Sequence, residues 1–594
     1  MSWMSTPTHQ GCMSDSPSHT RQVFPSAAAA PQSCAGYPLL IYETIRTQLL
    51  FPLFYSTDRN EATEMATDSL GTKLISAGGT LLGAAIVLQA VNLAVRAVYN
   101  LLGHPLSSLP GRKTWASSRL PFVRGLANGR LVQEIEDMHR QFGPIVRVAP
   151  DGVSFAHPDA WNDILLGRPG QRGFQKDPTW WTPMPGQAPG VITAIDDGLH
   201  AVLRRQISPG FTSRALREQE AVVQQYVDLL INRWRGIVEA NHGEGEIDVL
   251  RWFNYLTFDI FGDLAFAESF DCLRRSEYHQ WIAVIFDNLK YTGLAIAVRF
   301  QPVVAAILEF ISPGVVKLLP AWFLRAQRGH TKLITDKVQR RLAYKGDKLD
   351  FMSGFQTALE TESEGKEKSV ITIDHVNATF SQLAIAASET TAMALSATLN
   401  ILIHHTDKLE MVTKEVRDRF QSYDEITVST VRDLAYVNAV LTETMRLCPP
   451  VPFMPARRIP DGGATVCGKW LPGGTQVSVT FTSMHREPSS WQAPNSFCPE
   501  RWLPEAMNNP ESPFFNDKRH AFQPFSIGPH SCLGQNLAWV EMRLALAKLL
   551  WTFDVSAPAD PEKRVVWESL RTFLLIEKRP IRVVVKPRAE VAVK

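Results

Sequence analysis

The sequence predicts a mainly α-helical protein with a small β portion and a single membrane-spanning helix near its N-terminus. Long stretches with the apolar spacing of helices occupy three ranges, Glu218–Val238, His375–Ile403 and Gln535–Phe553. Apolar and polar residues alternate in Pro144–Phe155 around a Pro-Asp-Gly sequence, which predicts a β-hairpin. A second strand-like region spans Gly463–Phe481, with Gly473–Gly474 as its expected turn. The sequence contains no internal repeat.

The composition argues against several function classes. The chain has 594 residues and a formal net charge of +2, so its charge does not indicate a nucleic-acid partner. Its cysteines are odd in number and widely spaced without a CxxC pair, which argues against a zinc site and a disulfide scaffold. A reducing compartment, such as the cytosolic side of a membrane, fits this usage. The cysteines are Cys12, Cys34, Cys272, Cys448, Cys467, Cys498 and Cys532.

Residues 1–72 are expected to form an N-terminal tail, disordered at least over its first half. Residues 1–36 are rich in Ser, Thr, Pro and Ala, and such a segment buries too little apolar surface to become ordered. They also lack the layout of a signal peptide. The apolar run Tyr37–Tyr55 is interrupted by Glu43 and Arg46, and a position on the membrane surface stays open for it.

The membrane anchor is predicted at residues 73–96. Leu74–Val95 carries no formal charge over 22 residues, which is long enough to span a bilayer as a helix. Acidic residues gather before this run and basic residues after it, so the positive-inside rule places the C-terminal part in the cytosol. A buried core helix is the alternative interpretation. The flanking charges are Glu61, Glu64, Asp68 and Lys73 before the run, and Arg96, Arg112, Lys113 and Arg119 after it.

A Pro-rich connector is predicted at residues 97–115, followed by the main domain at residues 116–588. Pro105 and Pro110 stiffen the connector. Within the main domain, Ala297–Leu324 is largely apolar but broken by prolines. A substrate-access element that dips into the membrane and a piece of ordinary core explain this segment equally well.

Cys532 is the residue that most clearly indicates chemistry. It lies in the Gly-rich loop FSIGPHSCLG, directly before the helix expected from Gln535. Backbone N–H groups and the positive end of a helix stabilise a thiolate at such a position. The cysteine is therefore expected to be a nucleophile or a metal ligand.

Two sets of charged residues lie in apolar surroundings. Glu443 and Arg446 are three residues apart and share a helix face, a pattern that by itself indicates no more than a surface ion pair. Glu389 is the only formally charged residue between Asp374 and Asp407. Its side chain either points to solvent or is buried with a raised pKa, which would suit proton delivery.

A third set of residues is basic. His200 and Arg204 are four residues apart, so they share a helix face, and Arg457 precedes the second strand-like region. Solvated surface charges and contacts with an anionic group explain this set equally well. Arg205 and Arg458 are neighbours that could be mistaken for members of it.

The Cys532 loop resembles the haem-binding loop of the cytochrome P450 family, whose pattern is FxxGxRxCxG. Phe525, Gly528, Cys532 and Gly534 match this pattern. His530 stands where the family usually has an Arg that binds a haem propionate, and His is a weaker, pH-dependent cation. The resemblance implies haem b, with Cys532 as the axial thiolate ligand of the iron.

The other sets match further motifs of this family. Glu389 and Thr390 match the acid–alcohol pair of its oxygen-binding helix, in which Ala387 replaces the usual Gly. The resemblance implies a buried structural charge network of Glu443, Arg446 and Arg501. It also implies that the haem propionates are held by His200, Arg204, Arg457 and His530.

The order of these motifs is similar to that of fungal microsomal members, many of which act in secondary metabolism. The resemblance implies a monooxygenase that inserts one atom of O2 into an apolar small molecule, using electrons from NADPH–cytochrome P450 reductase. It implies a single-pass protein of the endoplasmic reticulum membrane whose catalytic domain faces the cytosol. The alternatives are a haem-thiolate isomerase or dehydratase, which uses no external electrons, and a non-enzymatic haem-binding or redox-partner protein. Retention of Glu389 and Thr390 argues against the isomerase.

Overall fold

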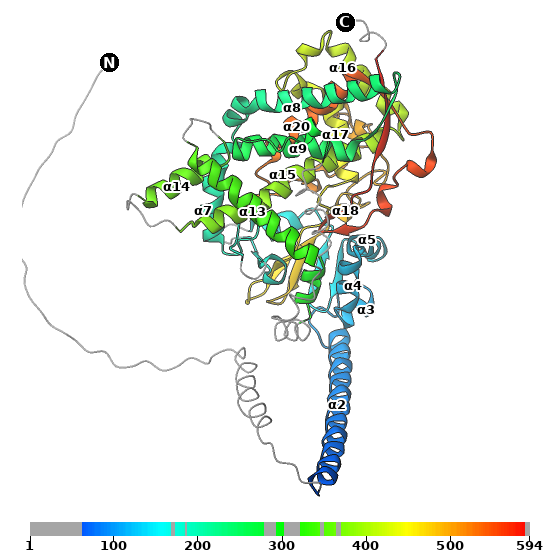
Figure 1. Cartoon of the computed structure of the whole chain (residues 1–594). Helices are drawn as coiled ribbons and strands as arrows, with labels where there is room; N and C mark the ends of the chain where they lie inside the picture. The colour runs from blue at the N-terminus through cyan, green and yellow to red at the C-terminus, as the bar shows by residue number, and fades with distance from the viewer. Residues whose placement is uncertain are drawn as a thin grey trace, which may run out of the picture. The chain divides into compact units, whose positions relative to one another are not determined.

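The computed structural model describes most of the chain from residue 62 onward (Figure 1). The described residues are 62–167, 173–183, 187–277, 293–301, 321–344, 350–363 and 370–588. The chain divides into two compact units, residues 1–89 and 90–594. The predictions for the tail up to residue 61, including Tyr37–Tyr55, and for most of Ala297–Leu324 lie outside the described residues.

Helix α2 covers Ala62–Leu102 and includes the predicted membrane anchor. Its stretch Gly83–Leu102 is long and apolar enough to cross a membrane, and none of that stretch is buried by the rest of the chain. Ile86 and Leu88, for example, are 61% and 70% exposed. A buried core helix, the alternative interpretation, is therefore wrong for this stretch. The apolar stretch reaches past residue 96 because apolar residues continue on both sides of Arg96.

The three long helices expected from apolar periodicity are confirmed. They are α8 (Ser213–Ala240), α15 (Ile373–Leu402) and α20 (Gln535–Thr552). The first begins after Thr212, whose hydroxyl accepts the Ala215 backbone N–H at 3.2 Å and so satisfies a free donor of the first turn. A capping box between Thr372 and His375 starts α15. Gly534 is the residue directly before α20, so the Cys532 loop leads straight into that helix.

Nearly all residues of helix α9 (Val249–Phe266) are buried. The helix packs against both α15 and α8 (Figure 1). It is apolar around nearly its whole circumference, as a helix surrounded by other helices must be. The main hydrophobic core is formed by α8, α9, α15, α20 and α17 (Ala435–Leu447). This core fixes α15, which carries Glu389 and Thr390, and α20, which directly follows the Cys532 loop.

The structure describes further helices besides these. They are α3 (Lys113–Ser117), α4 (Leu120–Asn128), α5 (Leu131–Phe142), α6 (Pro178–Trp181), α7 (Asp197–Ile207), α10 (Cys272–Arg275), α13 (Ala321–Ala343), α14 (Ser353–Ser363), α16 (Thr406–Arg419), α18 (Phe481–Met484) and α19 (Pro504–Asn508). Helix α7 begins after Asp196, whose carboxylate accepts the Leu199 N–H at 2.7 Å. This cap sets the direction in which α7 presents His200 and Arg204.

The predicted hairpin is confirmed as β1 (Ile145–Ala149) and β2 (Gly152–Phe155), which pair antiparallel. It belongs to a sheet with the order β1-β2-β8-β5-β3, in which β2 and β8 run parallel. The other strands of the sheet are β3 (Gln175–Lys176), β5 (Arg457–Arg458) and β8 (Gln476–Val479). Strands β3 and β5 are short, and they bring Lys176 opposite Arg457.

The second strand-like region is confirmed, and so is its turn at Gly473–Gly474. A further turn in this region was not predicted. Strands β6 (Ala464–Val466) and β7 (Lys469–Leu471) form a hairpin at Cys467–Gly468, where both residues have positive φ. The Gly473–Gly474 turn then leads the chain from this hairpin to β8 in the larger sheet.

The C-terminal strands were not predicted. Strand β12 (Arg582–Pro587) pairs with β4 (Gly245–Asp248) and β9 (Phe553–Ser556), and β10 (Thr572–Phe573) pairs with β11 (Leu575–Ile576). The Ile581 carbonyl accepts the Val249 N–H at 2.8 Å, so the segment between β11 and β12 is fixed against the start of α9. This pairing places residues near the C-terminus beside the middle of the helical core.

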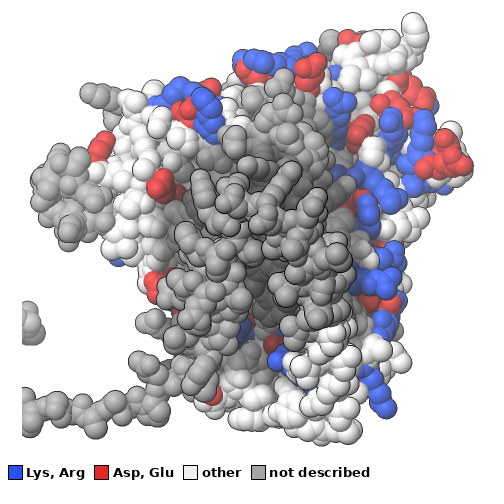
Figure 2. Space-filling model, turned by 60° about the horizontal axis from the view of Figure 1, so that its bottom comes forward, with Lys and Arg blue, Asp and Glu red and all other residues white. Residues whose placement is uncertain are grey.

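Charged side chains of both signs are mixed on the surface. Figure 2 shows Lys and Arg side chains interspersed with Asp and Glu along the edges of one face. This mixture agrees with the near-neutral net charge of +2.

Candidate active site

The Cys532 loop is a tight turn closed on itself. The Cys532 N–H donates to the Phe525 carbonyl at 2.8 Å, and Gly528 at the tip of the loop has a φ of 78°. A Cβ atom at Gly528 would lie 3.1 Å from the Leu165 carbonyl oxygen, so both backbone conformation and space favour glycine there. The Phe525 ring packs near Trp539 of α20, at 6.2 Å between ring centroids. The loop is thereby held between α20 and the short π-helix Asn162–Leu166.

The Cys532 thiol is exposed, although protein surrounds it closely. Burial raises the pKa of this thiol, while the N–H groups of Gly534 and Gln535 and the Arg204 guanidinium lower it. The backbone N–H groups therefore act toward the thiolate, as predicted, but do not by themselves outweigh burial. Metal coordination deprotonates a thiol outright, and this would supply the missing stabilisation.

Basic side chains from separate elements converge beside the loop. Arg204 donates to the Ser531 carbonyl at 2.7 Å, one residue before the cysteine. The His200 ring lies 4.0 Å from the His530 ring between centroids. Arg457 is only 4% exposed, and its Nε has no hydrogen-bond partner among the described residues. Arg458 instead pairs with the buried Asp177 at 2.7 Å and is partly exposed, and Arg205 is also exposed.

The surroundings of His530 favour its neutral form. Burial lowers its pKa to about 2, helped by the charges of Arg457, His200, Lys176 and Arg204. Its Nε2 lies 3.4 Å from a carboxylate oxygen of Asp197, and its buried Nδ1 has no partner among the described residues. The histidine therefore offers a hydrogen bond where the family's arginine would offer a full charge.

Lys176 is a member of this group that was not predicted. Its ammonium donates to the carbonyls of Ile192 and Ala194 at 2.6 and 2.9 Å. Burial, and to a smaller extent the charge of Arg457, lowers its pKa to about 7. A lone lysine in a short edge strand gives no sequence signal, because only the pairing of β3 with β5 brings it here.

The segment that Lys176 binds is also attached to α15. The Val191 N–H donates to Thr379 at 3.2 Å, and the Ile192 N–H donates to Gln382 at 3.0 Å. One stretch of backbone therefore connects the basic cluster to the helix that carries Glu389 and Thr390.

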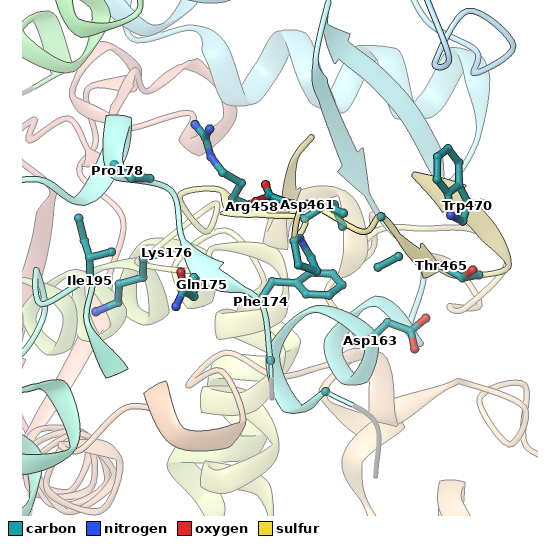
Figure 3. A pocket seen from close by; sticks show the side chains of 16 residues that line it. Asp163, Phe174, Gln175, Lys176, Pro178, Ile195, Arg458, Asp461, Thr465 and Trp470 are labelled. Atoms are coloured by element: carbon teal, nitrogen blue, oxygen red, sulfur yellow. The ribbon is translucent and has the colours of Figure 1, made fainter. Parts of the chain in front are cut away.

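A cavity of about 830 Å³ borders the same cluster (Figure 3). Strands β3 and β5 and the β6–β7 hairpin line it, with Phe174, Lys176, Arg458 and Trp470 among the lining side chains. Neither Cys532 nor Thr390 lines this cavity.

These residues fit an iron porphyrin. The described residues include no group of three or more His, Cys, Asp or Glu side chains able to hold a bare metal ion. A metal bound by Cys532 would therefore need to bring its other ligands with it, as haem iron does. The buried and unpartnered His530 Nδ1 and Arg457 Nε are suitable donors for two carboxylates beside that cysteine.

Glu443, Arg446 and Arg501 form one buried network. Glu443 and Arg446 bond through two contacts of 2.8 Å, and the Arg501 Nε donates to Glu443 at 3.0 Å. Arg501 also pairs with Asp517, and the Trp502 indole N–H donates to Glu443 at 2.8 Å. Burial alone would raise the pKa of Glu443, but its basic partners hold that pKa below its ordinary value.

Glu389 is buried in α15, so the alternative in which it points to solvent is wrong. Its side chain is 4% exposed and pairs at 2.7 Å with Lys578 from the C-terminal segment. Burial raises the pKa of Glu389, and the lysine only partly opposes this. Thr390 is adjacent and half-buried, and its hydroxyl donates to the Ala386 carbonyl at 2.8 Å. Helix α15 is continuous through Ala387.

Glu541 of α20 is a second buried carboxyl that was not predicted. It is 2% exposed, its Oε2 has no partner among the described residues, and burial raises its pKa to about 8. A hydrogen bond with Thr391 opposes this rise. The sequence did carry a signal, since Glu541 lies on the same helix face as the apolar Leu537 and Leu544.

The comparisons with known proteins agree with this geometry. The cytochrome P450 family model matches residues 110–583. The chain belongs to the cytochrome P450 family. It is 37% identical over 509 residues to the cytochrome P450 monooxygenase lcsI of Purpureocillium lilacinum, covering 85% of this chain and 94% of the relative. It is 36% identical over 492 residues to averantin hydroxylase of Dothistroma septosporum, covering 82% and 88%.

A third relative is the cytochrome P450 monooxygenase stcF of Emericella nidulans, 36% identical over 508 residues that cover 85% of this chain and 99% of the relative. The protein is thus a cytochrome P450 monooxygenase related to fungal enzymes of secondary metabolism. Membership implies haem with cysteine thiolate ligation, a redox partner and the use of O2. The apolar stretch of α2 could anchor this P450 in a membrane.

Proposed function

We propose that this P450 binds haem b through Cys532 and inserts one oxygen atom of O2 into an apolar small molecule of secondary metabolism. NADPH–cytochrome P450 reductase would supply the electrons. The observation that carries the proposal is the exposed Cys532 thiol, held in a closed loop beside convergent basic side chains. The relatives named averantin hydroxylase make averantin the first compound to test.

The haem, when bound, would supply the activation of dioxygen. The chain's own residues would hold it and manage protons. Arg204 fixes the loop by its bond to Ser531, and His200, Arg457, Lys176 and His530 would bind the propionates. We assign the Glu443 network a structural role, because its charges are fully buried and mutually satisfied.

Glu389 and Thr390 would deliver protons to the bound oxygen. Burial raises the pKa of Glu389, so this carboxyl binds a proton more readily than an exposed one, as a proton donor requires. The Thr390 hydroxyl is adjacent and can pass a proton on. A haem-thiolate isomerase would not need such a proton-donating pair, so the pair favours the monooxygenase.

The proposed location is the endoplasmic reticulum membrane, with one span and the catalytic domain in the cytosol. The basic residues Arg112, Lys113 and Arg119 follow the apolar stretch of α2, which supports this orientation. Reductases that use NADPH would meet the catalytic domain on the same face.

The test uses full-length protein in membranes together with NADPH–cytochrome P450 reductase. The reduced carbon monoxide spectrum should show the shifted band of a thiolate-bound haem, and Cys532→Ala should abolish this band. Cys467→Ala changes a half-buried cysteine in the β6–β7 turn and should leave the band intact. Absence of the band in the unaltered protein would refute the proposal.

Product formation then separates the enzyme classes. Averantin is incubated with NADPH and O2, and an oxygenated product that depends on both supports the monooxygenase. A product formed without NADPH would favour the isomerase or dehydratase. A normal band with no NADPH oxidation under any condition would favour a non-enzymatic haem-binding protein.

A further inference from the structure

Lys578 connects the buried Glu389 to the outside of the protein. It lies between β11 and β12, and its Nζ is 2.7 Å from the Glu389 carboxylate and 3.0 Å from the Asn254 Oδ1 of α9. The Lys578 side chain is 18% exposed, whereas Glu389 is 4% exposed. Lys578 is therefore the member of the pair nearer to solvent, and Glu389 is the inner one.

The position of Lys578 is fixed from several sides. Asn254 is fully buried and donates to the Leu250 carbonyl at 2.6 Å, so its Oδ1 is held toward the ammonium. The Val249–Ile581 hydrogen bond holds the following residues against the same helix. The charge of Asp248 also acts on Lys578.

Burial disfavours the charge on both partners. It lowers the pKa of Lys578 to about 8 while Glu389 opposes this, and it raises the pKa of Glu389. The two proton affinities are thereby brought toward each other. A proton can then cross between the two groups at a much lower cost than between a free lysine and a free carboxylate in water.

We propose that Lys578 is the proton donor that recharges Glu389 during turnover. After Glu389 has given up its proton toward Thr390, an N–H bond of the Lys578 ammonium breaks and an O–H bond forms on the carboxylate. Both groups are then neutral, and the amine recovers its proton from solvent water or buffer at its exposed side. In this proposal Lys578 acts only through Glu389 and does not itself contact the substrate or the haem. The inference rests on the proposed function of Glu389 and Thr390.

The decisive variant is Lys578→Arg. An arginine keeps the positive charge and can pair with Glu389, but it does not release a proton in a protein. A purely structural ion pair would therefore survive the change, whereas a proton donor would be lost. The matched control is Lys586→Arg on β12, where the lysine is 56% exposed and pairs with Glu244 at 2.8 Å.

The measurement is NADPH-driven turnover by the full chain with reductase, in H2O and in D2O. Averantin is the substrate if the unaltered enzyme converts it, and otherwise O2 consumption without substrate is followed. Lys578→Arg should retain the carbon monoxide band, lose about tenfold or more of the turnover rate, and show a larger solvent isotope effect. Lys586→Arg should match the unaltered enzyme in every respect.

Turnover within twofold of the unaltered enzyme and an unchanged isotope effect in Lys578→Arg would overturn the inference alone. If that variant lost the band through misfolding, Lys578→Gln would be judged by the same two criteria. Failure of the unaltered protein to show the band or any NADPH oxidation would instead refute the proposed function, on which the inference depends.

Discussion

Glu541 predicts a specific dependence of stability on pH. Its carboxyl is fully enclosed between α20 and α15, and burial raises its pKa to about 8, whereas an unfolded glutamate titrates near its ordinary value of about 4.3. Between these values the folded protein keeps a proton that the unfolded chain releases. Folding is therefore coupled to proton uptake, and this group makes the folded state less stable as the pH rises through that window.

The magnitude follows from the linkage relation. Each pH unit within the window costs about 1.4 kcal/mol of unfolding free energy. The roughly 470 residues of the family domain give an unfolding entropy of about 1 kcal/mol per kelvin near the midpoint. Glu541→Gln removes this titration. The Tm of the variant minus the Tm of the unaltered protein should therefore increase by about 1.4 °C per pH unit between pH 5 and 8.

The assay is thermal unfolding of the detergent-solubilised holoenzyme at half-unit pH steps. Taking the difference between variant and unaltered protein cancels the titration of all other groups. Glu410→Gln, at an exposed position of α16, is the control and should give a difference that does not change with pH. A flat difference for Glu541→Gln would mean that Glu541 is ionised in the folded protein, and the reasoning from burial would be refuted.

Three further predictions concern the site. Arg501→Met leaves the Glu443 charge without one of its buried partners, so it should lower the unfolding free energy by about 3–5 kcal/mol. Denaturant titration measures this loss, and an unchanged midpoint would contradict the prediction. Thr390→Ala should keep the carbon monoxide band but release more hydrogen peroxide per NADPH, and full coupling would show that the hydroxyl is not in the relay. His530→Arg places a permanent charge beside the propionates and should slow haem loss to apomyoglobin, whereas faster loss would mean that the His200–His530 contact is the better anchor.

Features set by short-range sequence were predictable. The long helices follow from apolar periodicity, and the β1–β2 hairpin follows from alternation around a turn. Glu443 and Arg446 lie one helical turn apart, so their pairing needed only the helix. Arg501 was assigned through a family motif, and its bond to Glu443 spans 58 residues of sequence.

What escaped prediction depends on pairing between distant segments. Lys578 is 189 residues from Glu389 in sequence, and it reaches that carboxylate only because β12 pairs with β4 at the start of α9. Lys176 joins the basic cluster only through the pairing of β3 with β5. The sequence could not exclude a solvent-exposed Glu389 for the same reason, since its partner Lys578 lies between strands that short-range patterns did not reveal.

The number of donors around each buried carboxyl explains why three similar groups behave differently. Glu443 accepts hydrogen bonds from Arg446, Arg501, the Trp502 indole and the Cys498 backbone, so its charge is stabilised and its proton does not return near neutral pH. Glu541 has an oxygen without a donor among the described residues and keeps its proton instead. Among the described residues Glu389 has a single basic partner, a lysine whose pKa burial lowers. Of the three carboxyls, Glu389 is thus the one with a weakened base beside it that can return a proton, which is why we assign it to the relay.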